Sequence, residues 1–150
     1  MFDKFNKEKK DFLKKKDKSK KGCIDGDIVK VVEEINLKKD YYTTSSCAGR
    51  IILLEMKSKK KNDCNWIFTK HKKINYNEIN NSLKKYKDEK IRHEIWFKQQ
   101  PLILHVACRD LDAAKRLLEE ARKVFKRAGV ISISESKVML EIIGTDNPQY

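Results

Sequence analysis

Three segments of the chain carry apolar residues at the spacing of one helical face. Within residues 24–35, 76–86 and 111–125, these residues recur every three or four positions, which predicts three amphipathic helices. Asp110 precedes the third segment and is a favourable N-cap residue. Gly129 follows it, where a glycine is expected to cap the C-terminal end of a helix.

Shorter runs between these segments are continuously apolar or alternate between apolar and polar residues, as β-strands do. The predicted strands are residues 51–56, 64–68, 91–97, 102–108, 130–134 and 137–143. The last two form a hairpin around Glu135 and Ser136. Gln100 and Pro101 separate two other strands, because proline lacks the N–H group that a strand ladder needs. Residues 41–50 are more polar, and read either as a turn at the start of a strand or as a site.

Hairpin-like connections dominate this order of elements. We therefore predict an α+β fold in which helices pack on a largely antiparallel sheet. The chain has only five glycines and no G-x-G-x-x-G motif after a strand, so a Rossmann-type methyltransferase fold or cofactor site is not expected. The predicted organisation is a basic segment at residues 1–21, helical or mobile, followed by a single α+β domain at residues 22–150.

The net charge of +13 points to a polyanionic partner, with nucleic acid first and an anionic membrane surface second. Residues 1–21 contain ten lysines against four acidic residues. A solubilising surface is the plainer explanation of the same charge. No apolar stretch approaches the roughly 20 residues needed to span a bilayer, and no secretory signal follows the first residues. We therefore expect a cytoplasmic protein that makes no contact with a membrane.

The four cysteines, Cys23, Cys47, Cys64 and Cys108, are far apart in the sequence. None of them forms a CxxC motif or a close Cys/His pair, so a structural zinc site is not expected. Cys47 could act as a nucleophile, as in a cysteine-dependent hydrolase, if a distant histidine served as its base. A small buried residue is the commoner role of such a cysteine.

Three features carry candidate chemistry. The first is the stretch SSCAGR at residues 45–50, where small residues let a ligand approach the backbone and Arg50 can grip a carboxylate or a phosphate. The second is His105, which lies in an apolar strand and needs a partner or a function there. The third is the stretch at Trp66 and His71, where an indole ring suited to base stacking precedes a titratable ring. Each feature also has a structural reading, as a turn, a satisfied core histidine and a core tryptophan.

Four blocks of the sequence resemble the wybutosine-synthesis methyltransferase family. The leading block is YYTTSSCAGRI, at residues 41–51. It follows KSKKGCIDGDIVKVVEEIN (18–36) and precedes WIFTKH (66–71) and PLILHVACRDLDAAKRLLEEA (101–121). The blocks occur in the family's order and span nearly the whole chain. One position differs, because Gln100 stands where the resemblance leads us to expect an acidic residue.

The resemblance implies S-adenosylmethionine as the methyl donor. It implies as acceptor the N(4) position of 7-(3-amino-3-carboxypropyl)-4-demethylwyosine at position 37 of tRNA(Phe). The residues then expected to contact the donor are Ser45, Ser46, Cys47, Gly49 and Arg50. His105 or His71 would accept the proton that the acceptor nitrogen loses. The residues expected to contact the tRNA are Lys20, Lys21, Trp66 and Arg109. The alternative reading is a basic RNA-binding module without enzymatic activity.

Overall fold

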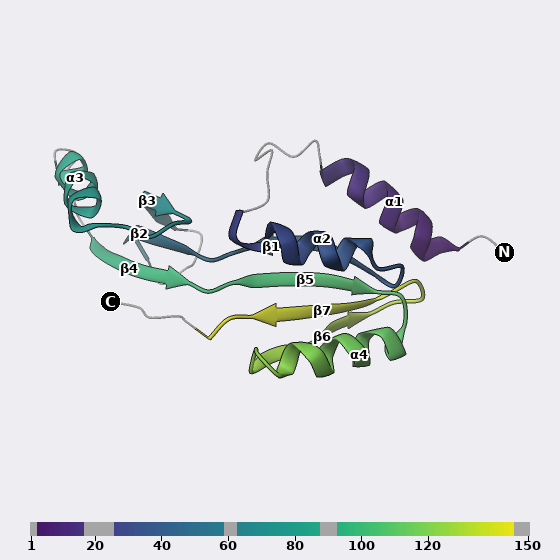
Figure 1. Cartoon of the computed structure of the whole chain (residues 1–150). Coiled ribbons are helices and arrows are strands. Elements are labelled where there is room, and N and C mark those ends of the chain that lie inside the picture. Colours follow the sequence, from purple (N-terminus) through teal and green to yellow (C-terminus); the bar gives the residue numbers. More distant parts are fainter. Residues whose placement is uncertain (1–2, 17–25, 59–62, 88–92, 146–150) are drawn as a thin grey trace. The chain divides into compact units, whose positions relative to one another are not determined.

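The computed structural model of the chain (Figure 1) describes residues 3–16, 26–58, 63–87 and 93–145. This part of the chain contains four α-helices, one short 3₁₀ helix and seven strands. In order these are α1 (Lys4–Lys16), η1 (Gly26–Ile28), α2 (Val29–Leu37), β1 (Tyr41–Cys47), β2 (Arg50–Met56), β3 (Cys64–Lys70), α3 (Tyr76–Lys87), β4 (Glu94–Gln100), β5 (Ile103–Cys108), α4 (Leu111–Arg122), β6 (Arg127–Ile133) and β7 (Val138–Ile143).

The fold consists of two compact units. Unit 1 comprises Met1–Ala48 and Leu102–Thr145, and unit 2 comprises Gly49–Pro101 and Asp146–Tyr150. Unit 1 holds a four-stranded sheet in the order β1-β5-β7-β6, and unit 2 holds a three-stranded sheet in the order β3-β2-β4. All the strand pairs in the described part of the chain are antiparallel. The predicted α+β class, with helices on antiparallel sheets, is therefore confirmed.

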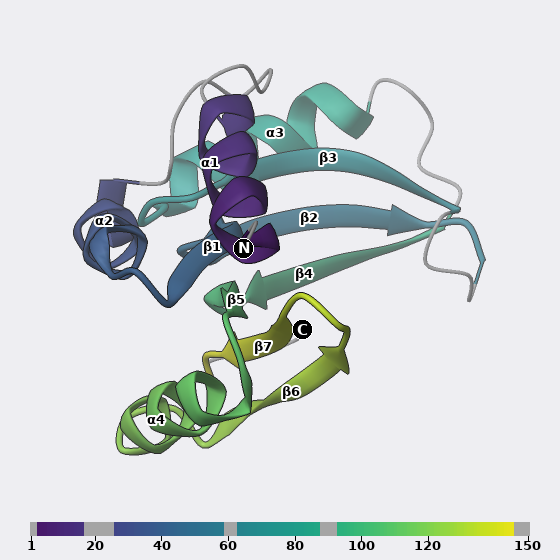
Figure 2. The same ribbon diagram turned by 90° about the vertical axis from the view of Figure 1, so that its right-hand side faces the viewer.

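One face of the four-stranded sheet is covered by α2 and α4, which lie on the same side of it in Figure 2. The core between them contains Leu104, Val106 and Cys108 of β5 and Leu140 and Ile142 of β7. These residues are every second position of their strands, and successive side chains of a strand point to opposite faces. We call this side of the sheet the apolar face.

The opposite face, which we call the polar face, is partly covered by α1. Phe5 of α1 is buried against Tyr42 of β1 and Ala107 of β5, and Phe12 and Met139 pack around them. The rings of Phe5 and Tyr42 have their centroids 5.3 Å apart. The basic N-terminal segment is therefore a helix over Lys4–Lys16, and residues 17–21 lie outside the described residues.

Unit 2 has a thinner core. Ile52, Leu53 and Leu54 of β2, the central strand, are buried, whereas α3 has no buried residue among those described. Glu55, next to them on β2, is also buried and accepts hydrogen bonds from Asn65 and from the hydroxyl of Tyr86. Polar contacts thus tie β2 to β3 and to α3.

The structure decides two local questions. Of the two readings of the polar stretch after Asp40, the turn is excluded, because residues 41–47 form β1, in which Tyr42 and Thr43 are buried. The polar groups of Thr43 are satisfied by Asn36 of α2, so a hydroxyl residue fits into the interior. Gly129 does not cap α4. The helix ends at Arg122, and Gly129 lies within β6.

Candidate functional site

A line of polar side chains crosses the polar face of the four-stranded sheet. Ser45 of β1 lies opposite His105 of β5, and His105 lies opposite Glu141 of β7. The Oγ of Ser45 is 2.9 Å from Nδ1 of His105, and Nε2 of His105 is 2.8 Å from Oε2 of Glu141. The predicted need of His105 for a partner is met twice, and we call these three residues the Ser–His–Glu line.

A β-bulge determines which hydroxyl meets the histidine. In the register of β1 against β5, Thr43 pairs with Val106, Thr44 is skipped, and Ser45 pairs with His105. Bulges re-aim side chains and occur often beside active sites. Next to the bulge, the backbone N–H of Thr43 donates to Oδ1 of Asn36 at 2.8 Å. The side chain of Asn36 therefore holds α2 against β1 at the irregular position.

The line defines the proton arrangement of a neutral His105. A carboxylate only accepts hydrogen bonds, so Nε2 must carry the proton that Glu141 accepts. Nδ1 is then an acceptor, and the hydroxyl of Ser45 donates to it. About a third of each of the His105 and Glu141 side chains is exposed, and Ser45 is exposed. This arrangement is suited to moving a proton from the surface into a carboxylate-backed imidazole.

Unit 2 carries a second group, built around a guanidinium. Arg50 pairs with Gln100 across β2 and β4, and its Nε donates to Oε1 of Gln100 at 2.5 Å. The Cζ of Arg50 lies 5.0 Å from the ring centroid of Trp66, which is 53% exposed. Among the described residues, the terminal nitrogens of Arg50 have no hydrogen-bond partner. We call Arg50, Gln100 and Trp66 the Arg50 cluster.

The residues predicted for the donor site divide between these surroundings. Ser45 and Cys47 lie on the polar face, because they pair with His105 and Ile103. Ser46 pairs with Leu104, whose side chain belongs to the core of the apolar face, so Ser46 does not share the face of Ser45. Gly49 and Arg50 belong to unit 2, where Gly49 has a φ of 100° that glycine adopts readily.

The other predicted site residues have different surroundings. Trp66 lies beside Arg50, whereas His71 follows β3 in unit 2 and His105 belongs to unit 1. Lys20 and Lys21 lie outside the described residues. Glu141 was not predicted, although a signal was present, because it interrupts an apolar strand just as His105 does.

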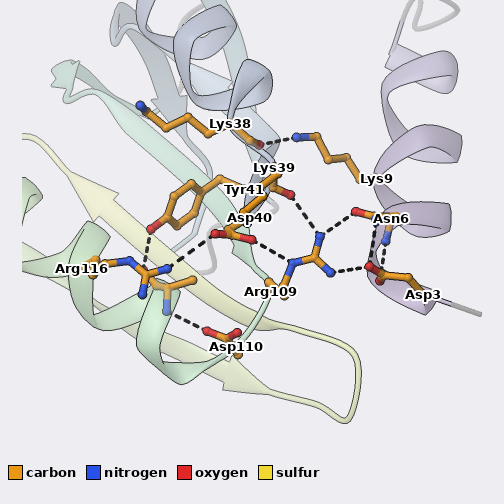
Figure 3. A network of polar contacts seen from close by, with 11 residues as sticks. Asp3, Asn6, Lys9, Lys38, Lys39, Asp40, Tyr41, Arg109, Asp110 and Arg116 are labelled. Carbon is orange, nitrogen blue, oxygen red and sulfur yellow. Dashed lines mark hydrogen bonds and ion pairs between the residues drawn. The ribbon is translucent and has the colours of Figure 1, made fainter. Parts of the chain in front are cut away.

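Arg109 is enclosed by partners within unit 1 (Figure 3). Its guanidinium donates to Asp40 at 2.9 Å, to Asp3 at 2.6 Å and to Asn6 at 2.7 Å. It also lies 4.7 Å from the ring centroid of Phe5. Asp3 in turn caps α1 through the N–H of Asn6. Arg109 therefore clamps α1 to the end of β5, and its donors are engaged by protein groups rather than facing a ligand.

A second attachment of α1 lies next to the β6–β7 hairpin. Glu8 accepts hydrogen bonds from Nζ of Lys137 at 2.6 Å and from Ser136 at 3.0 Å. The bond from Lys137 lowers the pKa of Glu8 below its ordinary value, and the same pair raises the pKa of Lys137. The pKa of Asp3 is lowered by the backbone N–H of Asn6 and by Arg109. Two acidic residues of the N-terminal segment are thus used to attach it.

The described residues offer neither a cluster of metal ligands nor a membrane-spanning helix. No group of three or more His, Cys, Asp or Glu side chains within these residues could hold a metal ion. No helix in the same part of the chain is both long and apolar enough to cross a membrane.

Comparison with known families identifies close relatives. The model of the family described as Methyltransferase TYW3 matches residues 7–147. A Danio rerio protein named tRNA wybutosine-synthesizing protein 3 homolog is 36% identical over 148 residues, covering 95% of this chain and 57% of that protein. A Methanocaldococcus jannaschii protein is 36% identical over 129 residues, covering 84% of this chain and 65% of its own length. Its name is tRNA(Phe) 7-((3-amino-3-carboxypropyl)-4-demethylwyosine(37)-N(4))-methyltransferase.

A solved structure has the same fold. The protein PH1069 from Pyrococcus horikoshii superposes with a TM-score of 0.87 at 32% identity, covering 97% of this chain and 75% of that one. The chain spans between about half and two thirds of the length of the curated relatives it matches.

Proposed function

Because the chain belongs to the TYW3 methyltransferase family, we propose that it is an S-adenosylmethionine-dependent tRNA methyltransferase. The proposed acceptor is N(4) of 7-(3-amino-3-carboxypropyl)-4-demethylwyosine at position 37 of tRNA(Phe). The observation that carries the proposal is the family match over residues 7–147, together with a relative whose name states this reaction. The methyl donor follows from the chemistry of the family.

The Arg50 cluster is suited to binding the carboxylate of the methyl donor. S-adenosylmethionine, when bound, supplies a methyl group on a positively charged sulfur, and it carries a free carboxylate. Arg50 has terminal nitrogens without a partner among the described residues, and a guanidinium binds a carboxylate through two parallel hydrogen bonds. Gln100 and Trp66 fix the orientation of Arg50. Arg50, with the backbone at Gly49, would therefore hold the carboxylate. Contacts of Ser46 and Cys47 with the donor stay predictions.

The Ser–His–Glu line is suited to accepting the proton that the acceptor nitrogen loses. Methyl transfer to nitrogen requires that this proton leave at some stage, and a histidine backed by a carboxylate is an effective general base. His105 has this support from Glu141, at 2.8 Å. We therefore assign His105 as the group on which a proton ends in the proposed reaction, and His71 is the second candidate for this role.

The exposed side of α1 is suited to binding the phosphates of the RNA backbone. Lys7, Lys10 and Lys14 are spaced by three and four residues, so they lie on one side of the helix. This side points away from Phe5. All three are exposed. We call them the lysine ridge and propose that it binds tRNA phosphates. Trp66 is proposed to stack on a base. Arg109 is left out of this surface because it clamps α1.

A titration with S-adenosylmethionine tests the donor assignment. The wild-type protein is expected to bind the donor, and Arg50→Ala is expected to weaken the binding by about 10- to 100-fold, because a charged hydrogen-bonded pair contributes about 1.5–3 kcal/mol. Lys98→Ala removes another cation that lies over an aromatic ring of the same sheet, Trp96, and serves as the matched control. Absence of binding to the wild type, with tRNA also present, would contradict the proposed function.

RNA binding and methylation distinguish the enzyme from an RNA-binding module without activity. Methyl transfer to tRNA(Phe) that carries the demethylated base should depend on Arg50 and on His105. Retained RNA affinity with no methyl transfer by the wild type would favour the binding module.

A salt titration of RNA binding tests the lysine ridge. Lys10→Gln/Lys14→Gln should reduce the slope of log Kobs against log[salt] by about 1.5. The control, Lys115→Gln/Lys126→Gln, removes two exposed lysines away from α1, one on α4 and one in the connection between α4 and β6.

A further inference from the structure

We propose that Ser45 is the residue that takes the proton from the substrate and passes its own proton to His105. His105 then acts through Ser45, and Glu141 is a positioning residue that fixes the tautomer of His105. This inference rests on the proposed function for the identity of the substrate, but the arrangement of protons within the line is a property of the protein alone.

The first argument is that both ring nitrogens of His105 are occupied. Nδ1 is 2.9 Å from the hydroxyl of Ser45, and Nε2 is 2.8 Å from the carboxylate of Glu141. A substrate N–H group could reach the imidazole directly only by displacing one of these partners. Ser45 is the exposed end of the line, whereas the side chains of His105 and Glu141 are about 29% and 34% exposed. The hydroxyl is therefore the member that a substrate reaches first.

The second argument is the direction of the hydrogen bonds. The carboxylate of Glu141 can only accept, so it selects the tautomer with the proton on Nε2. Nδ1 then carries a lone pair, and the hydroxyl of Ser45 points its proton toward that lone pair. This leaves the oxygen lone pairs of Ser45 for a donor on the open side of the sheet. Glu141 thus makes Ser45 a proton acceptor toward the substrate.

The proposed transfer is balanced. The N–H bond of the substrate breaks and its proton forms an O–H bond with Oγ of Ser45, while the O–H bond that Ser45 already had breaks and its proton moves to Nδ1 of His105. The electron pair of the N–H bond stays on the substrate nitrogen. His105 becomes an imidazolium cation, and its Nε2–H remains hydrogen-bonded to the carboxylate of Glu141, which neutralises the charge. Solvent takes the proton from His105 after the product leaves.

The surroundings of the line agree with this role. The bulge in β1 brings Ser45 rather than Thr44 opposite His105. On the far side, Gly129 of β6 pairs with Glu141, and a Cβ at Gly129 would meet nothing within 4 Å. The sheet is therefore open beside Glu141, and glycine in a strand interior often marks a close approach by a ligand.

The tautomer of His105 is measured first, in the protein without substrate. Nitrogen NMR of the imidazole should find the proton on Nε2 in the wild type. Glu141→Gln should abolish this preference, because the amide of glutamine can donate as well as accept, and Glu141→Asp should restore at least part of it. A wild-type protein with the proton on Nδ1 would overturn the proposal, whether or not the methylation assay succeeds.

Kinetics then assign the residue that meets the substrate. Ser45→Ala should lower kcat by about 10²- to 10⁴-fold, with KM for tRNA changed less than about threefold, and Ser45→Thr should recover most of the rate because it keeps the hydroxyl. Thr44→Ala removes the neighbouring hydroxyl and is the control. If Ser45→Ala keeps its kcat while His105→Gln loses it, His105 acts directly and the relay is wrong, although the methyltransferase function would stand.

Discussion

The two faces of the four-stranded sheet are built from alternate residues of the same strands, yet they are held in different ways. On the apolar face, α2 and α4 pack on an apolar core that includes Leu104, Val106 and Leu140. On the polar face, α1 contributes Phe5 and Phe12, and ion pairs at Arg109 and Lys137 complete its attachment. The rest of the polar face presents the Ser–His–Glu line.

This difference separates stability from chemistry. Burial of apolar side chains is the dominant stabilising contribution, and it is concentrated on the apolar face. The polar face can therefore carry a serine, a histidine and a glutamate in its middle without removing the core that holds the sheet together. Because α1 depends on charged contacts, its attachment should respond to pH and salt.

The largest expected effect comes from adjacent residues of β7 on opposite faces. Leu140→Ala should cost about 2–5 kcal/mol of unfolding free energy, because Leu140 is fully buried in the core. Met139→Ala on the polar face should cost roughly half of that, since Met139 is only partly buried. Urea denaturation measures both values. Equal costs would show that the two faces contribute alike to stability.

The next effect is expected at the clamp on α1. Arg109→Ala should destabilise the attachment of α1 by about 2–3 kcal/mol, because it removes charged hydrogen bonds to Asp3 and Asp40. Hydrogen exchange should increase in α1 and stay low in α4. The matched control is Arg116→Ala, which loses a longer and more exposed contact with Asp40 and should destabilise the attachment less than Arg109→Ala does. Unchanged exchange in α1 would argue that Phe5 alone holds the helix.

A smaller effect is expected on acidification. The folded-state pKa of Glu8 lies below its ordinary value of 4.5, so Glu8 stabilises the attachment fully above that value. This contribution is lost as the pH falls through the lower, folded-state pKa. The lowered pKa of Asp3 acts in the same direction. Hydrogen exchange of α1 followed below pH 5 should report the release, and Glu8→Gln should weaken its pH dependence. A wild-type helix with no acid transition would contradict the assignment.

The smallest perturbation of the protein is chemical modification, which compares the reactivity of two thiols on opposite faces. Burial raises the pKa of Cys108 on the apolar face to about 12, so only about 10⁻⁴ of this thiol is ionised at pH 8. Iodoacetamide should leave Cys108 unmodified in the folded protein and modify it after unfolding. Cys47, half-buried on the polar face, should react in the folded state. Peptide mass spectrometry reads both sites, and rapid modification of Cys108 would mean that the apolar face opens.

Much of the local structure follows from the sequence. The helical spacing after Asp110 predicts α4, and Asp110 does accept a hydrogen bond from the N–H of Ala113 at 2.8 Å. The apolar run at residues 102–108 predicts β5, which begins at Ile103. The prediction for Gly129 was wrong because α4 ends seven residues earlier, and the chain then has room to enter β6. A glycine near a helix does not by itself define the end of that helix.

The candidate site was only partly predictable. The position of His105 in an apolar strand predicted that it needs a partner or a function. The same reasoning applies to Glu141, which was not predicted. The pairing of Ser45 rather than Thr44 with His105 depends on a bulge in β1, beside which Asn36 of another element binds the N–H of Thr43. Local propensities do not contain that information.

The sequence by itself determined which residues alternate on strands such as β5 and where α4 begins, because these properties depend on neighbours within a few residues. It also determined which family the chain resembles, through blocks spread along the chain. The tertiary structure decided which polar groups meet. Ser45 and His105 are 60 residues apart, His105 and Glu141 are 36 apart, and Asp3 and Arg109 are 106 apart. Such contacts depend on strand register and helix docking, which only the packing of the whole unit selects.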